Sequence, residues 1–105
     1  MDDQRQLAED ILTRGTAILA EAETAGQPRL TELYEEAEDW RVPLRAMSPA
    51  GPLHLAMWRA AHAVVMAVSA VFYDGPGDHT ADPFFVEKRN EAKVALDRLG
   101  QELQR

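Results

Sequence analysis

Cysteine is absent from this chain of 105 residues. Its absence excludes disulfide bridges, thiolate zinc sites, iron–sulfur clusters and thiol nucleophiles. It is also compatible with a reducing compartment. Residues 1–5 lack the basic region of a signal peptide, and no apolar run follows them. We therefore expect a cytoplasmic protein.

Basic residues are too few for a generic nucleic-acid binder. Lys and Arg number 11 against 18 Asp and Glu, a net charge of −7. Binding to a phosphate backbone needs clustered cations, so no nucleic-acid partner is expected. Residues 1–40 carry 11 acids and 3 bases, whereas residues 41–105 carry 7 acids and 8 bases. The excess of acid therefore lies entirely in the first part of the chain.

Long apolar runs are also lacking. The longest nearly uncharged run covers the 14 residues 60–73. Spanning a bilayer takes about 18 or more such residues. We expect this run to form a buried core helix, and we expect no membrane partner.

No segment alternates between apolar and polar residues in the way that predicts strands. Apolar residues instead recur every three or four positions, which is typical of helices. The sequence predicts one all-α domain over 1–105, an antiparallel four-helix bundle in up-down-up-down order, because short connections favour antiparallel neighbours. The expected helices cover 3–24, 28–41 (or, with a kink at Pro43, up to 47), 52–73 and 83–104.

Glycine and proline mark the expected helix ends. Gly26 suits the left-handed position after a helix, and Pro28 suits the first turn of the next one. Asp82 and Pro83 together form a strong helix start. Gly15 lies within the first helix, where it costs roughly 1 kcal/mol relative to Ala. Close approach of a neighbouring helix and tolerated drift both explain it.

The helix expected over 52–73 has two apolar stripes on nearly opposite sides. A helix that is apolar nearly all round is buried nearly all round. It is then either central in the bundle or in contact with another chain. We expect a homodimer that forms through this helix.

Acidic residues crowd the outer side of the helix over 28–41. Five carboxylates fall within eight residues, 32–39. Like charges one turn apart repel, so this cluster does not strengthen the helix. It can steer a basic protein surface, although a merely solvated face is the other interpretation. The first interpretation predicts a small adaptor, inhibitor or regulatory subunit whose partner-binding residues are Glu32, Glu35, Glu36 and Asp39.

Motifs for catalysis and metal binding are missing. A di-metal bundle needs Glu three residues before a ligand His, but Gly51 precedes His54 and Arg59 precedes His62. The glycines at 75–77 have no following Lys to hold a phosphate. The acids of the loop over 74–82 do not match a calcium-binding spacing. We expect no catalytic residue, no metal and no cofactor.

A ligand-binding bundle remains the alternative function. His62 and Met66 are one turn apart and are both residue types that ligate haem iron. A buried His bonded to a carbonyl, with Met as filler, is the simpler interpretation. The candidate pocket residues of this alternative are Tyr34, Trp40, Trp58, His62 and Met66.

Overall fold

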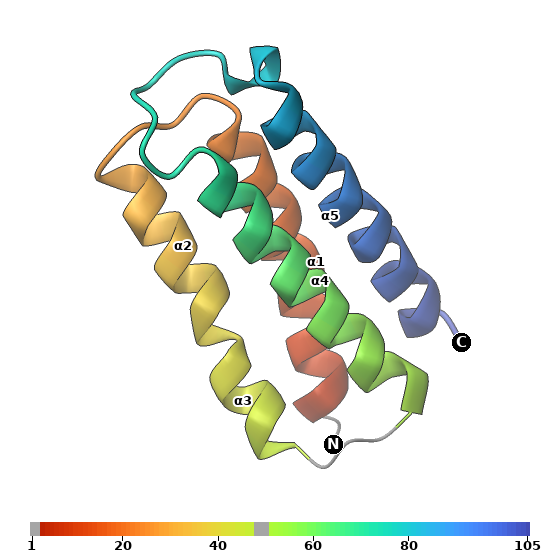
Figure 1. The fold of residues 1–105 in the computed structure, drawn as a ribbon. Helices are drawn as coiled ribbons and strands as arrows, with labels where there is room; N and C mark the ends of the chain where they lie inside the picture. The colour runs from red at the N-terminus through yellow and green to blue at the C-terminus, as the bar shows by residue number, and fades with distance from the viewer. Residues whose placement is uncertain (1–2, 48–50) are drawn as a thin grey trace.

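The computed structural model describes residues 3–47 and 51–105 of the chain. Within these ranges the chain is 81% helical, without strands, and four helices pack against each other (Figure 1). The predicted all-α class is confirmed. In chain order, the elements are α1 (Asp3–Ala22), α2 (Arg29–Asp39), α3 (Arg41–Ala46), α4 (Gly51–Ala70), the short 3₁₀ helix η1 (His79–Ala81) and α5 (Pro83–Leu103).

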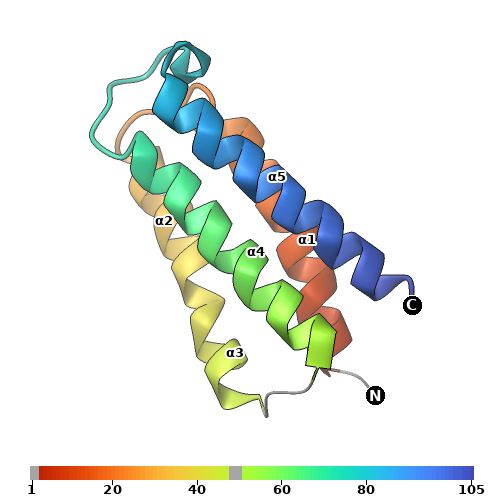
Figure 2. The same ribbon diagram turned by 45° about the vertical axis from the view of Figure 1, so that its right-hand side comes forward.

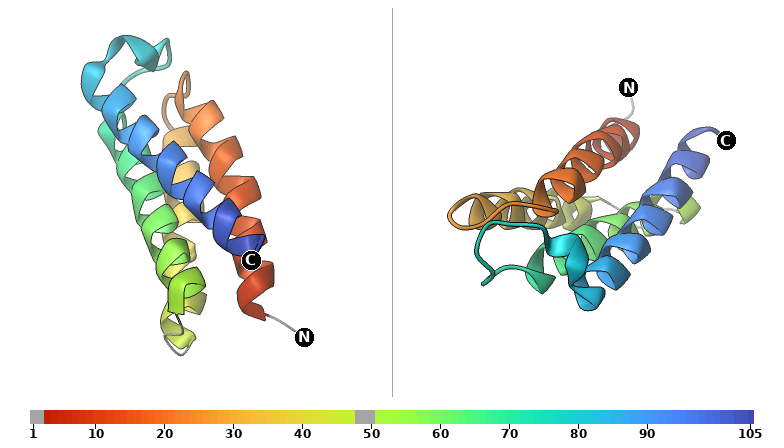
Figure 3. Two further views of the ribbon diagram at one scale, coloured as in Figure 1. Left: turned by 90° about the vertical axis from the view of Figure 1, so that its right-hand side faces the viewer. Right: turned by 90° about the horizontal axis from the view of Figure 1, so that it is seen from above.

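Helix α4 is the central element. It lies between α2 and α5 in two views of the molecule, with α1 behind it (Figures 1 and 2). It contacts α1, α2, α3 and α5. The bundle is elongated, 42 × 22 × 17 Å along its principal axes, and the start of α1 and the end of α5 lie toward one end (Figure 3).

One apolar core joins the described helices. Each helix turns an apolar stripe inward, because burial of apolar side chains is the main favourable term in folding. The connections at residues 23–28 and 71–82, the second of which contains η1, lie together at the end of the bundle where α1 ends and α5 begins (Figure 1). The largest fully buried side chains are Phe85, Ile11, Ile18, Leu30, Leu33, Leu44, Met57, Leu99, Val64, Val68 and Val71.

Gly15 occupies a point where three helices meet. A Cβ atom at this position of α1 would lie 3.0 Å from Leu96 Cδ2 of α5 and 3.4 Å from Val64 Cγ2 of α4. The close-approach explanation of this glycine is therefore the one that the contacts favour.

The expected left-handed conformation of Gly26 is wrong. Among the glycines in the described ranges, Gly51 and Gly77 have positive φ, 75° and 151°. Gly26 is needed for a different reason, because a Cβ atom there would lie 2.6 Å from both N and Cδ of Pro76. The loop before α5 thus packs directly on the loop after α1.

Helix α4 is central in the bundle but is not buried all round within the described chain. His62, Met66 and Ser69 are exposed. Because α4 has neighbours on only part of its circumference, one stripe of it still faces solvent.

By length and composition α4 is also able to cross a membrane, but half of that stretch is buried in the bundle, and core helices pass the same test. The length and composition of α4 are therefore only weak evidence for a membrane-spanning helix.

Proline residues lie in the first turns of two helices, α5 and α3. Asp82 caps α5, since its side chain accepts a hydrogen bond from Phe84 N at 2.9 Å, and Pro83 is the first helical residue. This predicted helix start is confirmed. Pro43 lies within the first turn of α3, where a missing N–H is tolerated, so the chain continues as a short second helix after Trp40. The sequence also predicts Ser48 or Gly51 near the start of the next helix; α4 begins at Gly51, and Ser48 lies outside the described residues.

Candidate functional site

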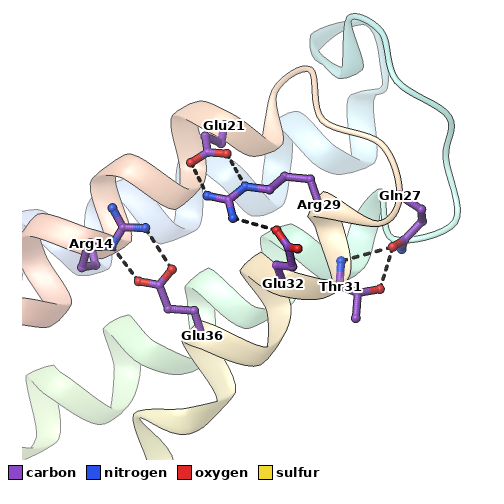
Figure 4. Close-up of polar contacts among 7 residues, drawn as sticks. All are labelled: Arg14, Glu21, Gln27, Arg29, Thr31, Glu32 and Glu36. Atoms are coloured by element: carbon purple, nitrogen blue, oxygen red, sulfur yellow. Dashed lines mark hydrogen bonds and ion pairs between the residues drawn. The ribbon is translucent and has the colours of Figure 1, made fainter.

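The acidic side chains of α2 fall into two groups, and the first faces α1. Arg14 forms two hydrogen bonds with Glu36, from Nε to Oε2 at 2.6 Å and from Nη2 to Oε1 at 2.9 Å (Figure 4). Arg29 Nη1 donates to Glu32 Oε1 at 2.9 Å. The charges of Glu32 and Glu36 are therefore compensated within the chain.

The same network extends to the end of α1. Arg29 holds Glu21 through two further hydrogen bonds, both 2.7 Å long. The hydrogen bond from Arg14 lowers the pKa of Glu36, and that from Arg29 lowers the pKa of Glu21. Paired guanidinium and carboxylate groups of this geometry are the stronger kind of hydrogen bond. Together they tie α2 to α1.

The second group of acids points away from the bundle. Glu35 and Asp39 are exposed and form no ion pair with any residue of the described ranges. Glu38 pairs with Arg41 at 3.4 Å, and its charge is the main cause of the raised pKa of Tyr34. Of the four acids predicted to bind a partner, Glu35 and Asp39 are thus the two with uncompensated charge.

The outer face of α4, defined as Leu55, Arg59, His62, Met66 and Ser69, is exposed between its neighbours. Leu55 and Met66 are 50% and 37% exposed, which is high for large apolar side chains. Just beyond the helix end, Tyr73 is 93% exposed. The sequence predicts a homodimer through this helix without assigning a side of it, and this partly apolar stripe is the side that the bundle leaves exposed.

The residues of the alternative ligand pocket lie in different environments. Trp40 is buried and donates from Nε1 to Asp10 Oδ2 at 3.2 Å. Trp58 is partly buried, whereas His62 and Met66 are exposed. These four candidate pocket residues line neither the hollow beside Tyr34 nor the hollow between α4 and α5.

Tyr34 does line a hollow. Its ring meets that of Phe72 edge-on, with centroids 5.5 Å apart. Together with Ser69 and Tyr73, the two rings surround a hollow of about 370 Å³ that opens to solvent. Aromatic edges rather than convergent polar groups make up most of its lining, so it offers little to orient a ligand.

Two of the three histidines have structural roles. His54 is buried, and its Nε2 lies 3.1 Å from the carbonyl oxygen of Leu44, which links α4 to α3. His79 is also buried, and its Nε2 lies 2.7 Å from the carbonyl oxygen of Ala25. Its backbone N–H donates to the Glu23 carbonyl at 2.8 Å. Across 3–47 and 51–105, no group of three or more His, Cys, Asp or Glu is placed to hold a metal.

A larger hollow, of about 510 Å³, lies between the start of α4 and the end of α5. Arg59 and Arg98 line it, with Leu55 and Val94. The sequence did not predict that these two arginines share a site, because 38 residues lie between them and they belong to different helices. The available signal was Arg59, a charged residue within an otherwise apolar helix.

Comparison with protein-family models, curated proteins and solved structures found no match to this chain. Function is therefore inferred from the chain's own residues.

Proposed function

We propose that the protein is a small non-enzymatic interaction protein of the cytoplasm, an adaptor, inhibitor or regulatory subunit, that presents α2 to a basic protein surface. The observation that carries this proposal is the exposure of Glu35 and Asp39 without an ion-pair partner in the described chain. An uncompensated surface charge of one sign attracts and orients a partner of the other sign.

The rest of α2 holds these two carboxylates in place. Leu30, Leu33 and Ala37 are fully buried on its opposite side. The ion pairs of Arg14 with Glu36 and of Arg29 with Glu21 hold it against α1. A partner therefore meets a preorganised acidic face, which lowers the entropy lost on binding.

The test is a double substitution, Glu35→Gln with Asp39→Asn, measured by titrating a ten-residue polylysine peptide into labelled protein and following amide NMR shifts. The matched control is Glu87→Gln with Asp97→Asn, two exposed acids of α5 that also form no ion pair in the described ranges. Both pairs change the net charge equally. We expect the α2 variant to weaken binding about threefold to tenfold and the control much less.

Equal weakening in the two variants would sink the proposal, because the peptide would then respond to net charge alone. Shift changes that avoid α2 in the native protein would have the same consequence.

We further propose that the helices follow the antiparallel up-down-up-down order and that two copies pair through the end of the outer face of α4 that carries Met66. The exposed side chains of Met66 and, just beyond the helix end, Tyr73 support the pairing, and neither lines the hollow between α4 and α5. The alternative of a pocket around Trp58, His62 and Met66 has no comparable support, since His62 and Met66 are exposed.

A further inference from the structure

The hollow between α4 and α5 has an apolar floor that is open to solvent. Leu55 and Val94 line it and are 50% and 54% exposed. Pro52, Ala56 and Ala95 complete the apolar part of the lining. Its volume of about 510 Å³ lies in the range of small-molecule sites, which are mostly apolar with a few placed polar groups.

Two arginines from different helices border this floor. Neither Arg59 of α4 nor Arg98 of α5 forms a hydrogen bond or ion pair with any residue in 3–47 or 51–105. The other arginines of α1, α2 and α5 do form ion pairs, with distances from 2.6 to 3.8 Å. In a chain with 18 acidic residues against 11 basic ones, this pair is left without a carboxylate.

The acids that also line the hollow have cations of their own. Glu91 pairs with Lys88 at 3.2 Å, and Glu102 pairs with Arg105 at 3.6 Å. Neither of those cations lines the hollow. Arg59 and Arg98 are therefore the charged residues of this lining that have no partner of opposite sign within the described ranges.

We propose that this hollow binds a small amphipathic carboxylate, a molecule with one carboxylate head and an unbranched apolar chain. The head is held by Arg59 and Arg98, because guanidinium groups form paired hydrogen bonds with carboxylates. The chain covers Leu55 and Val94, whose apolar surface it removes from water. This ligand goes beyond the proposed function, since the hollow lies on a different surface from Glu35 and Asp39.

The experiment uses octanoate below its micelle concentration, with calorimetry and amide NMR shifts on the full chain. Acetate carries the head without the chain, and 1-octanol carries a chain without the charge. We expect octanoate to bind more tightly than either probe, with shift changes around Leu55 and Val94. Tighter or equal binding of 1-octanol would overturn the role of the arginines, and equal binding of acetate would overturn that of the floor.

Substitutions separate the two arginines from surface charge in general. Arg59→Gln and Arg98→Gln are each expected to weaken octanoate binding about tenfold or more, as loss of a charged hydrogen bond does. Arg45→Gln is the matched control, because Arg45 is an exposed arginine of α3 that also has no ion pair in the described ranges. Unchanged affinity in both hollow variants, or equal loss in the control, would overturn the proposal.

A second pair of variants distinguishes loss of binding from loss of folding. Arg98→Lys keeps a cation and should retain part of the affinity for octanoate. Val94→Gln removes part of the apolar floor and should weaken octanoate binding severalfold without changing the weak binding of acetate. Helical content by circular dichroism identifies folded variants. If folded Val94→Gln binds octanoate as the native chain does, the chain does not lie on this floor and the proposed site is wrong.

Discussion

Single residues at the loop end of the bundle determine how its two connections fit together. Gly26 lies against Pro76, and the contact is so close that a side chain at position 26 would have no room. His79 is joined to the same loop through the carbonyl oxygens of Glu23 and Ala25. The connection over 71–82, which the sequence presents as a run of turn residues, is therefore bonded to the connection after α1.

At this scale we predict that Gly26→Ala destabilises the protein by about 1–3 kcal/mol, as overpacking of a filled site does. The added Cβ would lie 2.6 Å from the backbone nitrogen of Pro76, so the backbone must shift. Urea denaturation followed by circular dichroism measures the change. Gly75→Ala is the control, because nothing lies within 4 Å of a Cβ there, and its stability should stay equal or rise slightly. Equal stability of the two variants would contradict the contact.

At the scale of elements, α2 is held by its buried apolar side and by the arginines of the network with α1. Sequence periodicity places the apolar side of α2 well, because Leu30, Leu33 and Ala37 recur at helical spacing and are all buried. It does not show that Arg14 meets Glu36, since that contact depends on how α1 and α2 lie against each other. The division of the acids into compensated and free ones follows from this contact.

The network predicts a dependence of stability on pH. The hydrogen bond from Arg14 lowers the pKa of Glu36 in the folded state below its ordinary value, about 4.3. Its contribution to stability is therefore complete above that value and is lost as the pH falls through the folded pKa. We expect the melting temperature to fall between about pH 5 and pH 3, and to fall less in Arg14→Gln.

Thermal melts of the native chain, Arg14→Gln and Arg45→Gln over this pH range measure the effect. Arg45 has no ion pair in the described ranges, so its variant should follow the native curve. An Arg14→Gln curve parallel to the native one would show that Glu36 does not carry the pH dependence.

At the scale of the whole molecule, α4 is both the core of the bundle and the source of its exposed apolar stripe. The two roles share one helix because α4 is apolar on more of its circumference than its neighbours cover. Large exposed apolar side chains on one face mark contact surfaces more often than isolated ones do. The proposed dimer follows from this face.

We predict that Met66→Glu shifts a dimer to monomers, because a charge placed at a packed interface loses its hydration. Met66 is 37% exposed, so the change should leave the fold intact. Light scattering with size exclusion at about 100 μM measures the mass. Val42→Glu on α3, where the native side chain is 70% exposed, is the matched control. A native chain that is monomeric at this concentration would exclude the proposed pairing.

Local sequence was enough for the helical class, the start of α5 at Asp82 and Pro83, and the acidic first part of the chain. These depend on spacing, capping and composition, which are properties of neighbouring residues. Contacts between distant segments decided the rest. Arg14 pairs with Glu36 and so compensates part of the charge of α2, the contact with Pro76 accounts for Gly26, and the packing of α4 on α5 brings Arg59 and Arg98 to one hollow. Such pairings depend on three-dimensional packing, which one helix's periodicity does not encode.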